Sequence, residues 1–362
     1  MKILFVSGDL CDGGAQRVIS VIANTLAEKG HEVTVLLYSR SEKEYELNSN
    51  IKLFALAESY EIYSKINPIL RIKKIRSFLK SISPDVAVGF LQGGYGLFLS
   101  SYGMKFKKVG STRVDPKIII ERKGLRAEIN RMWFRHADAV VLQTDTQLER
   151  VRDMNWKNKV VISNPVSDVA LETDEHDYTR PCRTITMAGR LEKSKNYPMV
   201  LDMMELLHHK YPDVKLRIFG QGSLKEEIER EIVNRKLEEV VSLNGWTADI
   251  VVEHQKADMY ILSSDYEGMP NALMEAMACG LPCISTDCPT GPSSLIVNGE
   301  NGILVPVGNV GVMTDAVERI LCMTTKERAQ MGMRAKDTIY KAYNKEIITK
   351  KWERLFEELL KG

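Results

Sequence analysis

Short apolar runs alternate with segments of helical periodicity along this chain, and the alternation constrains the fold more than any other feature. Each run has the length of one buried strand, and the segments between them are long enough for helices. In the first half, the expected strands are residues 2–7, 32–37, 85–90, 107–110, 139–142 and 159–162, and the expected helices are 14–29, 66–82 and 118–135. Strands separated by such helices pair in parallel, so the sequence predicts a doubly wound α/β sheet.

The alternation stops at a polar segment and then begins again. Residues 166–182 lie in a stretch without apolar period, so we expect them to form a linker. After this stretch, a second series predicts strands at 184–188, 215–219, 240–243, 259–262, 283–285 and 303–305, with helices between them. A chain of 362 residues suits two domains, which we place at 1–165 and 183–343. The amphipathic helix expected at 344–362 can cap the second domain or return to the first.

Charge is divided unevenly between the two halves, although the net charge is only +2. Residues 1–165 hold 26 Lys and Arg against 17 Asp and Glu (+9), whereas residues 166–362 hold 24 against 31 (−7). A basic half indicates an anionic partner. No stretch reaches the ~18 apolar residues of a spanning helix. The six cysteines form no CxxC pair, so we expect a cytoplasmic protein with free thiols.

One segment of the second domain carries two carboxylates eight residues apart. Glu267 precedes a turn in which Pro270 suits the first helical position, and Glu275 follows inside the helix. N–H groups at the start of a helix attract anions. The turn can therefore hold a diphosphate between one carboxylate for sugar hydroxyls and one for ribose hydroxyls. Taken alone, the segment also fits a surface helix with a solvent-facing glutamate.

Three glycine-containing loops follow predicted strands, at the ends where open α/β sheets bind ligands. Gly189 and Arg190 begin a loop that also carries Lys195, and such cations bind phosphate oxygens. A solvated basic loop is the alternative. Residues 220–222 form a small glycine turn, and residues 13–14 open a helix where a phosphate or sugar can approach closely. Both can equally be tight turns, because neither completes a dinucleotide fingerprint.

Together these segments resemble glycosyltransferase family 4, a family of retaining, nucleotide-sugar-dependent enzymes with the GT-B fold. The resemblance covers nearly the whole chain and rests on Gly13-Gly14-Ala-Gln-Arg17, Gly189-Arg190 with Lys195-Asn196, Gly220-Gln-Gly222, the segment from Ser263 to Pro282, and Asn298-Gly-Glu-Asn-Gly302. It implies two Rossmann-like domains facing a central cleft, with the acceptor side in the first and the donor site in the second. It also implies that the helix 344–362 packs back on the first domain.

The resemblance further implies a role for each matching residue. Arg190 and Lys195 would neutralise the donor diphosphate as the leaving group departs. Glu267 would bind sugar hydroxyls and stabilise an oxocarbenium-like transition state, and Glu275 would bind the ribose. The remaining donor-binding residues are Gly13, Gly14, Gly189, Gly268, Met269, Pro270, Asn271 and Ala272. We expect no metal and no other cofactor, because the chain has no Asp-x-Asp motif and its histidines lack ligand spacing.

One segment of the first domain differs from the usual family pattern. Many members carry a histidine near the position where this chain has Arg113. The pattern Ser-x-Arg-x-Asp-Pro, which ends at Asp115-Pro, resembles a bacterial subgroup that builds surface polysaccharides, lipopolysaccharide and lipid-linked oligosaccharides. We therefore expect Arg113, Asp115 and Arg17 near the acceptor or the cleft. The alternative for Asp115 is a cap on the following helix.

The segment 65–80 is both basic and apolar. It carries six Lys and Arg residues with no acid, and isoleucine, leucine and phenylalanine lie between them. Such a helix can dock on an anionic membrane, here through Lys73, Lys74 and Arg76. Alternatively, its apolar residues pack on the sheet and only its charges are exposed. Docking would place the protein on the inner face of the cell membrane.

The sequence thus predicts a retaining glycosyltransferase of bacterial polysaccharide or glycan biosynthesis. It would move a hexose or N-acetylhexosamine from a nucleotide sugar, with UDP favoured, to a saccharide acceptor linked to polyprenyl diphosphate. We expect an anionic membrane surface as a further partner, and no nucleic acid. A nucleotide-sugar 2-epimerase of the same fold and an inactive sugar-nucleotide-binding module are the alternatives. A nicotinamide dehydrogenase is excluded because its glycine fingerprint is missing.

Overall fold

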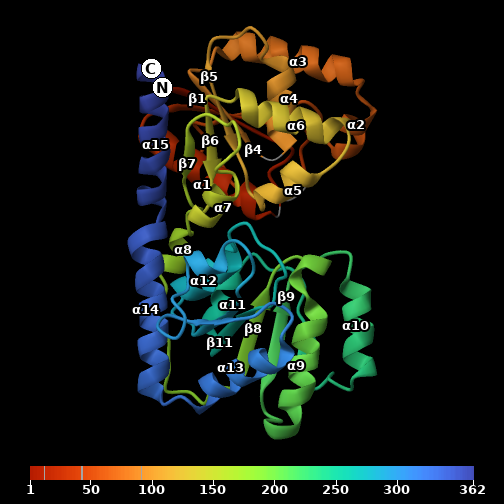
Figure 1. Cartoon of the computed structure of the whole chain (residues 1–362), viewed down its shortest axis with the longest axis vertical. Coiled ribbons are helices and arrows are strands. Elements are labelled where there is room, and N and C mark those ends of the chain that lie inside the picture. Colours follow the sequence, from red (N-terminus) through yellow and green to blue (C-terminus); the bar gives the residue numbers. More distant parts are fainter. Residues whose placement is uncertain (12, 42–43, 91) are drawn as a thin grey trace. The chain divides into compact units, whose positions relative to one another are not determined.

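The computed structural model describes residues 1–11, 13–41, 44–90 and 92–362. The chain divides into two compact units, Met1–Pro165 with Lys345–Gly362, and Val166–Asn344 (Figure 1). Each unit is built on one parallel sheet covered by helices, so the predicted α/β class is confirmed. Among the described helices, none combines the length and the apolar character needed to cross a bilayer.

The first unit contains a seven-stranded sheet in the order β3-β2-β1-β4-β5-β6-β7. Its strands are β1 (Lys2–Ser7), β2 (Glu32–Leu37), β3 (Lys52–Ala55), β4 (Val86–Phe90), β5 (Lys107–Ser111), β6 (Ala139–Leu142) and β7 (Lys159–Val161). Successive side chains of a strand point to opposite faces. Ile3 and Phe5 of β1 therefore enter one core, and Leu4 and Val6 enter the other.

Helices cover both faces of this sheet. The core that contains Phe5 is closed by α1 (Gly14–Glu28) and by α15 (Lys345–Lys361). The opposite core is closed by α3 (Pro68–Ile82), α4 (Gln92–Ser100) and α6 (Leu125–His136). The short helices α2 (Tyr60–Lys65), α5 (Pro116–Glu121) and α7 (Asp145–Arg150) complete the unit.

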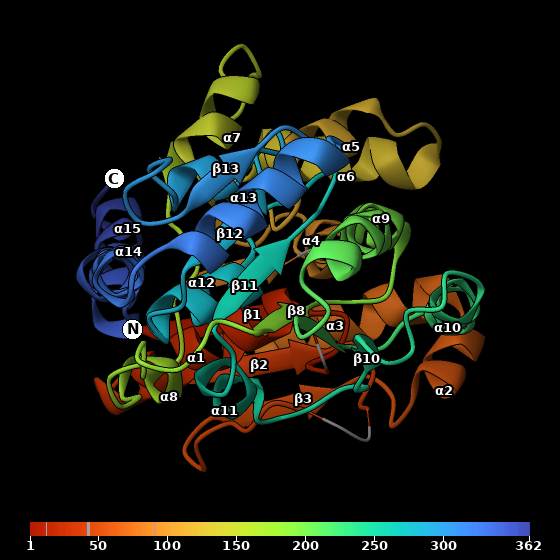
Figure 2. The same cartoon turned by 90° about the horizontal axis from the view of Figure 1, so that it is seen from below.

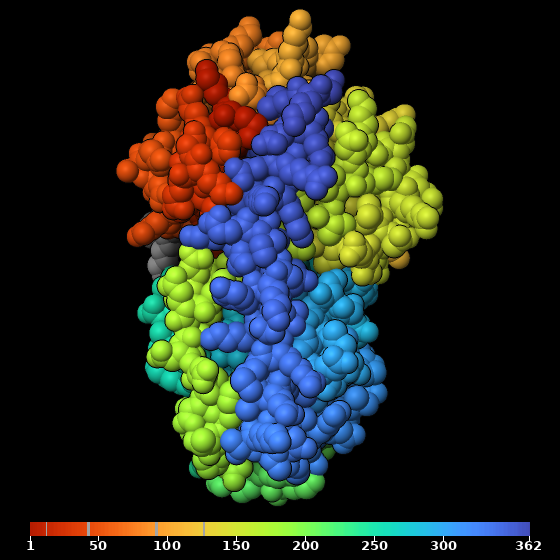
Figure 3. Space-filling view, turned by 90° about the vertical axis from the view of Figure 1, so that its left-hand side faces the viewer, coloured from red at the N-terminus to blue at the C-terminus, as the bar shows by residue number. Residues whose placement is uncertain are grey.

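The last helix, α15, belongs to the first unit and does not cap the second. Its apolar stripe buries Ile348, Trp352 and Phe356, and the Trp352 ring lies 6.1 Å from that of Phe90 on β4. Burying each side chain of this size contributes roughly 1.5–3 kcal/mol. Glu353 on the same helix accepts a hydrogen bond from Lys29. In Figure 3 the helix, in blue, lies between the red N-terminal residues and the yellow-green residues of this unit.

The second unit contains a six-stranded sheet in the order β10-β9-β8-β11-β12-β13. Its strands are β8 (Thr184–Ala188), β9 (Lys215–Phe219), β10 (Val241–Leu243), β11 (Met259–Leu262), β12 (Cys283–Thr286) and β13 (Ile303–Val305). One face is covered by α9 (Tyr197–Lys210), α10 (Lys225–Asn234) and α13 (Val310–Cys322). The other is covered by α8 (Asp168–Leu171), α11 (Ile250–Gln255), α12 (Asn271–Ala278) and α14 (Thr325–Tyr343). Figure 2 shows α9 and α13 across the sheet from α11 and α12.

The segment expected to be a linker, residues 166–182, is packed on the second unit. The Tyr178 hydroxyl donates to the carbonyl of Gly280 (2.6 Å), and Arg328 on α14 donates to the carbonyl of Tyr178 (2.9 Å). Lys336 on the same helix donates to the carbonyl of Thr173. Figure 3 shows this segment, in yellow-green, running beside the blue α14. These contacts could not be predicted from the polar composition of the segment. Because the segment packs on the second unit, the boundary between the units falls at Pro165.

The helix predicted at 118–135 is divided in two. Gly124 adopts φ +107, a backbone conformation that favours glycine, and it separates α5 from α6. The helix predicted from residue 66 begins at Pro68, because the Asn67 side chain caps it by accepting from the N–H of Ile69 (2.9 Å).

Candidate active site

Glu267 lies in the loop between β11 and α12, at the carboxyl edge of the second sheet. Its side chain is 13% exposed. Pro270 caps α12 in an extended conformation, so the helix begins at Asn271 and the prediction that Pro270 is the first helical residue is wrong by one position. Proline has no side-chain acceptor, and Pro270 makes no side-chain capping hydrogen bond to the first turn of α12. The start of a helix carries N–H groups that suit an anion.

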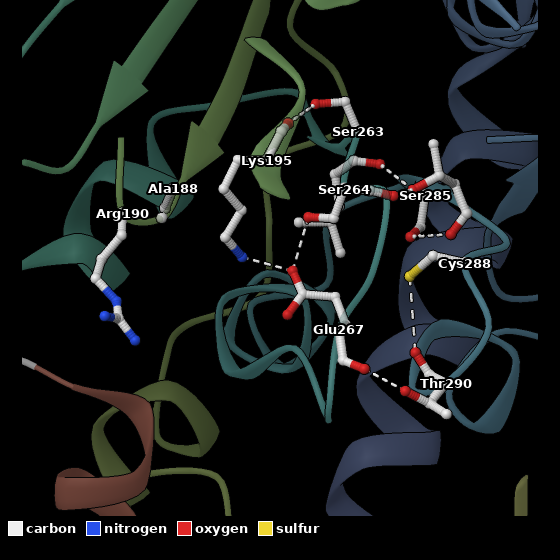
Figure 4. Close-up of polar contacts among 12 residues, drawn as sticks. Ala188, Arg190, Lys195, Ser263, Ser264, Glu267, Ser285, Cys288 and Thr290 are labelled. Carbon is white, nitrogen blue, oxygen red and sulfur yellow. Dashed lines mark hydrogen bonds and ion pairs between the residues drawn. The ribbon is translucent and has the colours of Figure 1, made fainter. Parts of the chain in front are cut away.

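One carboxylate oxygen of Glu267 receives two hydrogen bonds. The Lys195 ammonium lies 2.5 Å from Oε1, and the Ser264 hydroxyl donates to the same atom at 2.7 Å. The Thr290 hydroxyl donates to the Glu267 backbone carbonyl. Figure 4 shows these contacts converging on Glu267 from three different segments. Lys195 and Glu267, which the sequence proposed as catalytic residues, are thus brought together.

Arg190 and Lys195 both come from the loop after β8. The Arg190 side chain is 67% exposed and pairs with the neighbouring, partly exposed Glu192 (3.2 Å), so its guanidinium can reach a ligand at little cost. Gly189 matters because a Cβ there would lie 3.1 Å from Cε of Lys195. The glycine therefore leaves room for the stem of the lysine that contacts Glu267.

The glycine turn after β9 supports this loop. A Cβ on Gly220 would come within 1.9 Å of the Gly189 carbonyl oxygen, and one on Gly222 within 2.5 Å of the Leu191 carbonyl oxygen. Gly220 also adopts φ +146. The two glycines therefore allow backbone-to-backbone packing that fixes the loop of Arg190 and Lys195. Their role in the described structure is that of a tight turn, the simpler of the two alternatives.

The loops after β8 and β11 are also joined directly. The Ser263 hydroxyl donates to the Lys195 carbonyl (2.6 Å), and the Asn196 side chain donates to Asp265 (2.7 Å). Asn196 has φ +48 and caps α9, a conformation that asparagine tolerates better than most residues. The sequence indicates no role for Ser263, Ser264 or Thr290, because a buried hydroxyl leaves no periodic signal.

Glu275 lies on the core side of α12 and is 5% exposed. The alternative of a solvent-facing glutamate is therefore wrong. A buried carboxylate is costly unless it is paired or hydrogen-bonded. Its burial in the same helix whose entry carries Glu267 supports a defined binding role.

Together with burial, the negative charge of Glu267 raises the pKa values of two neighbouring groups. Burial and then the Glu267 charge raise the pKa of the Cys288 thiol to about 12, so this cysteine is an inert thiol at neutral pH. Burial and the same charge also raise the pKa of Tyr197, whose hydroxyl lies 3.3 Å from the Arg190 carbonyl. Within the described residues, no group of three or more His, Cys, Asp or Glu is arranged to hold a metal ion.

The residues of the first unit that were predicted to lie near a ligand have different surroundings. Gly13 precedes α1, where its carbonyl accepts from the N–H of Arg17 (3.0 Å), and Gly14 is exposed at the first helical position. Burial lowers the pKa of Arg17. Asp115 caps α5 by accepting from the N–H of Lys117 (3.0 Å), and it pairs with Arg150 (2.8 Å). The capping alternative for Asp115 is therefore the one the structure supports, and its carboxylate is already engaged.

Arg113 is buried beside the C-terminal helix. Its Nη1 donates to Asn164 (2.6 Å), and its guanidinium lies 4.8 Å from the ring of Phe90 and 5.8 Å from that of Trp352. Desolvation by burial lowers its pKa to about 9. These contacts tie the loop after β5 to α15 within the first unit. An acceptor contact of Arg113 stays a prediction.

The basic helix α3 divides into two faces. Ile75 and Leu79 are buried against the sheet, whereas Ile69 and Leu70 are 64% and 47% exposed. Lys73 and Lys74 follow four residues after that exposed pair and share its face. Arg76 does not join this face, because its guanidinium donates to the carbonyls of Ser100 (2.9 Å) and Tyr102 (2.8 Å). The prediction that Arg76 contacts membrane is therefore replaced by a structural role at the end of α4.

Comparison with known proteins agrees with this geometry. Residues 178–338 match the family described as glycosyl transferases group 1. The chain is 25% identical over 345 residues to the lipopolysaccharide core biosynthesis glycosyltransferase LpsE of Rhizobium meliloti, covering 93% of this chain and 94% of that protein. It is 26% identical to the N-acetylgalactosamine-N,N'-diacetylbacillosaminyl-diphospho-undecaprenol 4-alpha-N-acetylgalactosaminyltransferase of Campylobacter jejuni, covering 86% and 88%.

Solved structures of similar fold include Anabaena Alr3699/HepE in complex with UDP and glucose (TM-score 0.82, 16% identity, 99% of each chain). Another is a mutant of S. aureus TarM in complex with Fondaparinux, alpha-GlcNAc-glycerol and UDP (TM-score 0.81, 16% identity, 98% and 100%). Residues 178–338 therefore form a glycosyl transferases group 1 domain, and the chain is a glycosyltransferase with the GT-B fold.

Proposed function

We propose that this glycosyltransferase is a retaining, family 4 enzyme that transfers a hexose or N-acetylhexosamine from a UDP-sugar to a lipid-linked saccharide acceptor in bacterial surface-glycan biosynthesis. One observation carries the proposal: Lys195 and Glu267, from loops at the carboxyl ends of β8 and β11, meet at 2.5 Å beside the start of α12. A cation, a carboxylate and a helix N-terminus at one point suit a nucleotide sugar.

Each group has a distinct task in this proposal. Lys195 and the exposed Arg190 neutralise the charge that develops on the diphosphate as the glycosidic bond breaks. Glu267 holds the sugar through its hydroxyls and stabilises the positive charge that develops on the ring. Glu275, buried in α12, accepts hydrogen bonds from the ribose. Because two cations and helix N–H groups balance the leaving group, the reaction needs no metal.

The relatives supply the proposed substrate classes. The solved structures of TarM and HepE contain UDP, which supports a UDP-sugar donor. The name of the Campylobacter relative specifies a diphospho-undecaprenol acceptor, and LpsE acts in lipopolysaccharide core biosynthesis. Both names support an acceptor carried on a lipid.

We also propose that the first unit binds an anionic membrane on its cytoplasmic side through α3. Ile69 and Leu70 expose apolar surface beside Lys73 and Lys74, and a helix face of this kind inserts apolar side chains while its cations meet acidic lipid. A lipid-linked acceptor lies in such a surface. Membrane binding would therefore bring the enzyme to its acceptor.

The direct test is a screen of nucleotide sugars by thermal shift, followed by assays of the stabilising donor with and without polyprenyl-diphosphate saccharides. The proposal predicts a glycosylated lipid product with retained anomeric configuration, formed only when the acceptor is present. Conversion of the donor without acceptor into an epimeric sugar would instead identify a 2-epimerase. Binding without turnover under either condition would identify an inactive binding module.

A further inference from the structure

We propose that Ser264 is a positioning residue, whose hydroxyl keeps the Glu267 carboxylate oriented when Lys195 turns to the donor diphosphate. The inference rests on the proposed function, in which Lys195 and Glu267 face different parts of one donor. In the described structure these two groups neutralise each other at 2.5 Å. Binding of a diphosphate therefore competes with Glu267 for the ammonium group.

The two partners of Glu267 differ in mobility. Lys195 ends a flexible four-carbon stem, is 17% exposed and can reach another anion by rotation about its side-chain bonds. Ser264 has 0% exposure, and its hydroxyl donates to Glu267 Oε1 at 2.7 Å. When the lysine moves, the serine hydroxyl remains as the partner of Oε1.

The backbone on either side of this contact is held by two buried threonines. Thr286, at the end of β12, donates from its hydroxyl to the Ser264 carbonyl (2.6 Å). The hydroxyl of Thr290 donates to the Glu267 carbonyl. Both threonines are at most 1% exposed. Both ends of the segment 264–267 are therefore held through their carbonyls. Ser264 adds a restraint on rotation of the Glu267 side chain, a contact that Figure 4 shows.

This restraint selects which oxygen meets the substrate. Lys195 and Ser264 both contact Oε1, which leaves Oε2 for a sugar hydroxyl. Ser264 thus keeps the Glu267 carboxylate oriented when its cationic partner is withdrawn.

A double-mutant cycle tests this role. Ser264→Ala should lower kcat for the donor that the wild-type enzyme uses by about 10–100-fold, the range expected when a hydrogen bond to a charged group is lost. The affinity for free UDP should change by less than about 2-fold, because the substitution leaves the contacts to the nucleotide unchanged and these are equally strong in the ground and transition states. In a Glu267→Ala background, Ser264→Ala should have no further effect on kcat.

Ser285→Ala is the matched control. Ser285 is equally buried on β12, and its hydroxyl donates to the Thr286 carbonyl (3.0 Å). Among the hydrogen bonds of the described residues, it makes none to Lys195 or Glu267. The control should keep the wild-type kcat. Ser264→Cys provides a second variant of nearly the same volume, with a weak donor in place of the hydroxyl, and it should lose kcat as alanine does even if the alanine variant folds poorly.

The outcomes separate the two proposals. Unchanged kcat in Ser264→Ala or Ser264→Cys, or an equal loss when Glu267 is already alanine, would overturn the positioning role while the glycosyltransferase site stands. Absence of UDP release by the wild-type enzyme from every UDP-sugar, with or without acceptor, would overturn the proposed function and the positioning role with it.

Discussion

The ammonium of Lys195 lies 2.5 Å from Oε1 of Glu267, across 72 residues of sequence. This ion pair joins the loop after β8 to the loop after β11 and is largely shielded, with side-chain exposures of 17% and 13%. Removing either charge would leave the other largely buried without its ionic partner, which is costly. The ion pair orders both side chains before a donor binds. A bound donor would replace this interaction with its own contacts to Lys195 and Glu267.

Glu275→Gln should weaken nucleotide binding more than turnover. The substitution keeps the volume of a side chain that is 5% exposed, and it removes the charge that would accept from ribose hydroxyls. Ribose contacts are similar in the ground and transition states, so we expect the Kd for UDP, measured by calorimetry, to rise about 10-fold with kcat nearly unchanged. A kcat loss with unaltered Kd would assign Glu275 to the chemical step instead.

Activity should survive exhaustive treatment with EDTA. The proposed leaving-group partners are Arg190, Lys195 and the N–H groups of α12, and these require no cation. The measurement is the rate of UDP release before and after chelation. A loss that only Mg²⁺ or Mn²⁺ restores would contradict the metal-independent mechanism.

Charge reversal on α3 should abolish binding to anionic liposomes. Lys73→Glu with Lys74→Glu removes the cations of the exposed face and leaves Arg76, which holds the end of α4, untouched. We expect the wild-type protein to float with anionic vesicles at low salt and to be released at high salt, because salt screens surface charge.

The matched control for flotation is Lys350→Glu with Lys351→Glu. These are two adjacent exposed lysines on α15 of the same unit, so the change in net charge is identical. The control should float as the wild type does. Equal flotation of the α3 variant and the wild type would remove the membrane role from this helix.

His254 should make the protein less stable below pH 6.5. Its ring is fully buried, packs edge-on against Tyr260 (5.4 Å) and lies 3.2 Å from the Thr186 hydroxyl. Desolvation lowers its pKa to about 3. Between about pH 6.5 and 3, His254 is protonated in the unfolded chain but neutral in the folded chain. Its contribution to the free energy of unfolding is therefore complete above pH 6.5 and is lost as the pH falls.

The check is the pH dependence of the free energy of unfolding. Because one proton is involved, the wild type should lose up to about 1.4 kcal/mol per pH unit more than His254→Phe within that window. Phenylalanine keeps an aromatic ring against Tyr260. Parallel pH profiles of the two proteins would show that this histidine takes up its proton as readily in the folded state as in the unfolded state.

The fold could be predicted where buried strands leave continuous apolar runs, as in β1, β8 and β9, whose bounds agree with the prediction. The helix α4 was not predicted, since its glycines disfavour a helix in isolation. The structure requires them: a Cβ on Gly93 would lie 2.0 Å from the Val6 carbonyl oxygen, and one on Gly94 would lie 2.4 Å from Trp133 Nε1. Close packing against distant residues overrides local propensity there.

The residues of the candidate site were likewise only partly predictable from the sequence. Glu267 and Lys195 could be proposed from the sequence, because they follow predicted strands at the ligand edge of an α/β sheet and match the pattern of glycosyltransferase family 4. Ser264 and Thr290 could not, since their importance lies in which atom each hydroxyl faces. For Arg76 and Asp115 the charge was visible but the partner was not. Both residues hold backbone groups in the first unit.

In the proposed mechanism, Glu267 stabilises the transition state of sugar transfer. The turnover of Glu267→Ala, measured as UDP release with donor and acceptor both saturating, tests this role. We predict a loss on the order of 10²–10³-fold, the scale seen when one transition-state stabiliser is removed, with UDP affinity retained. Turnover equal to that of the wild type would contradict the assignment of this site.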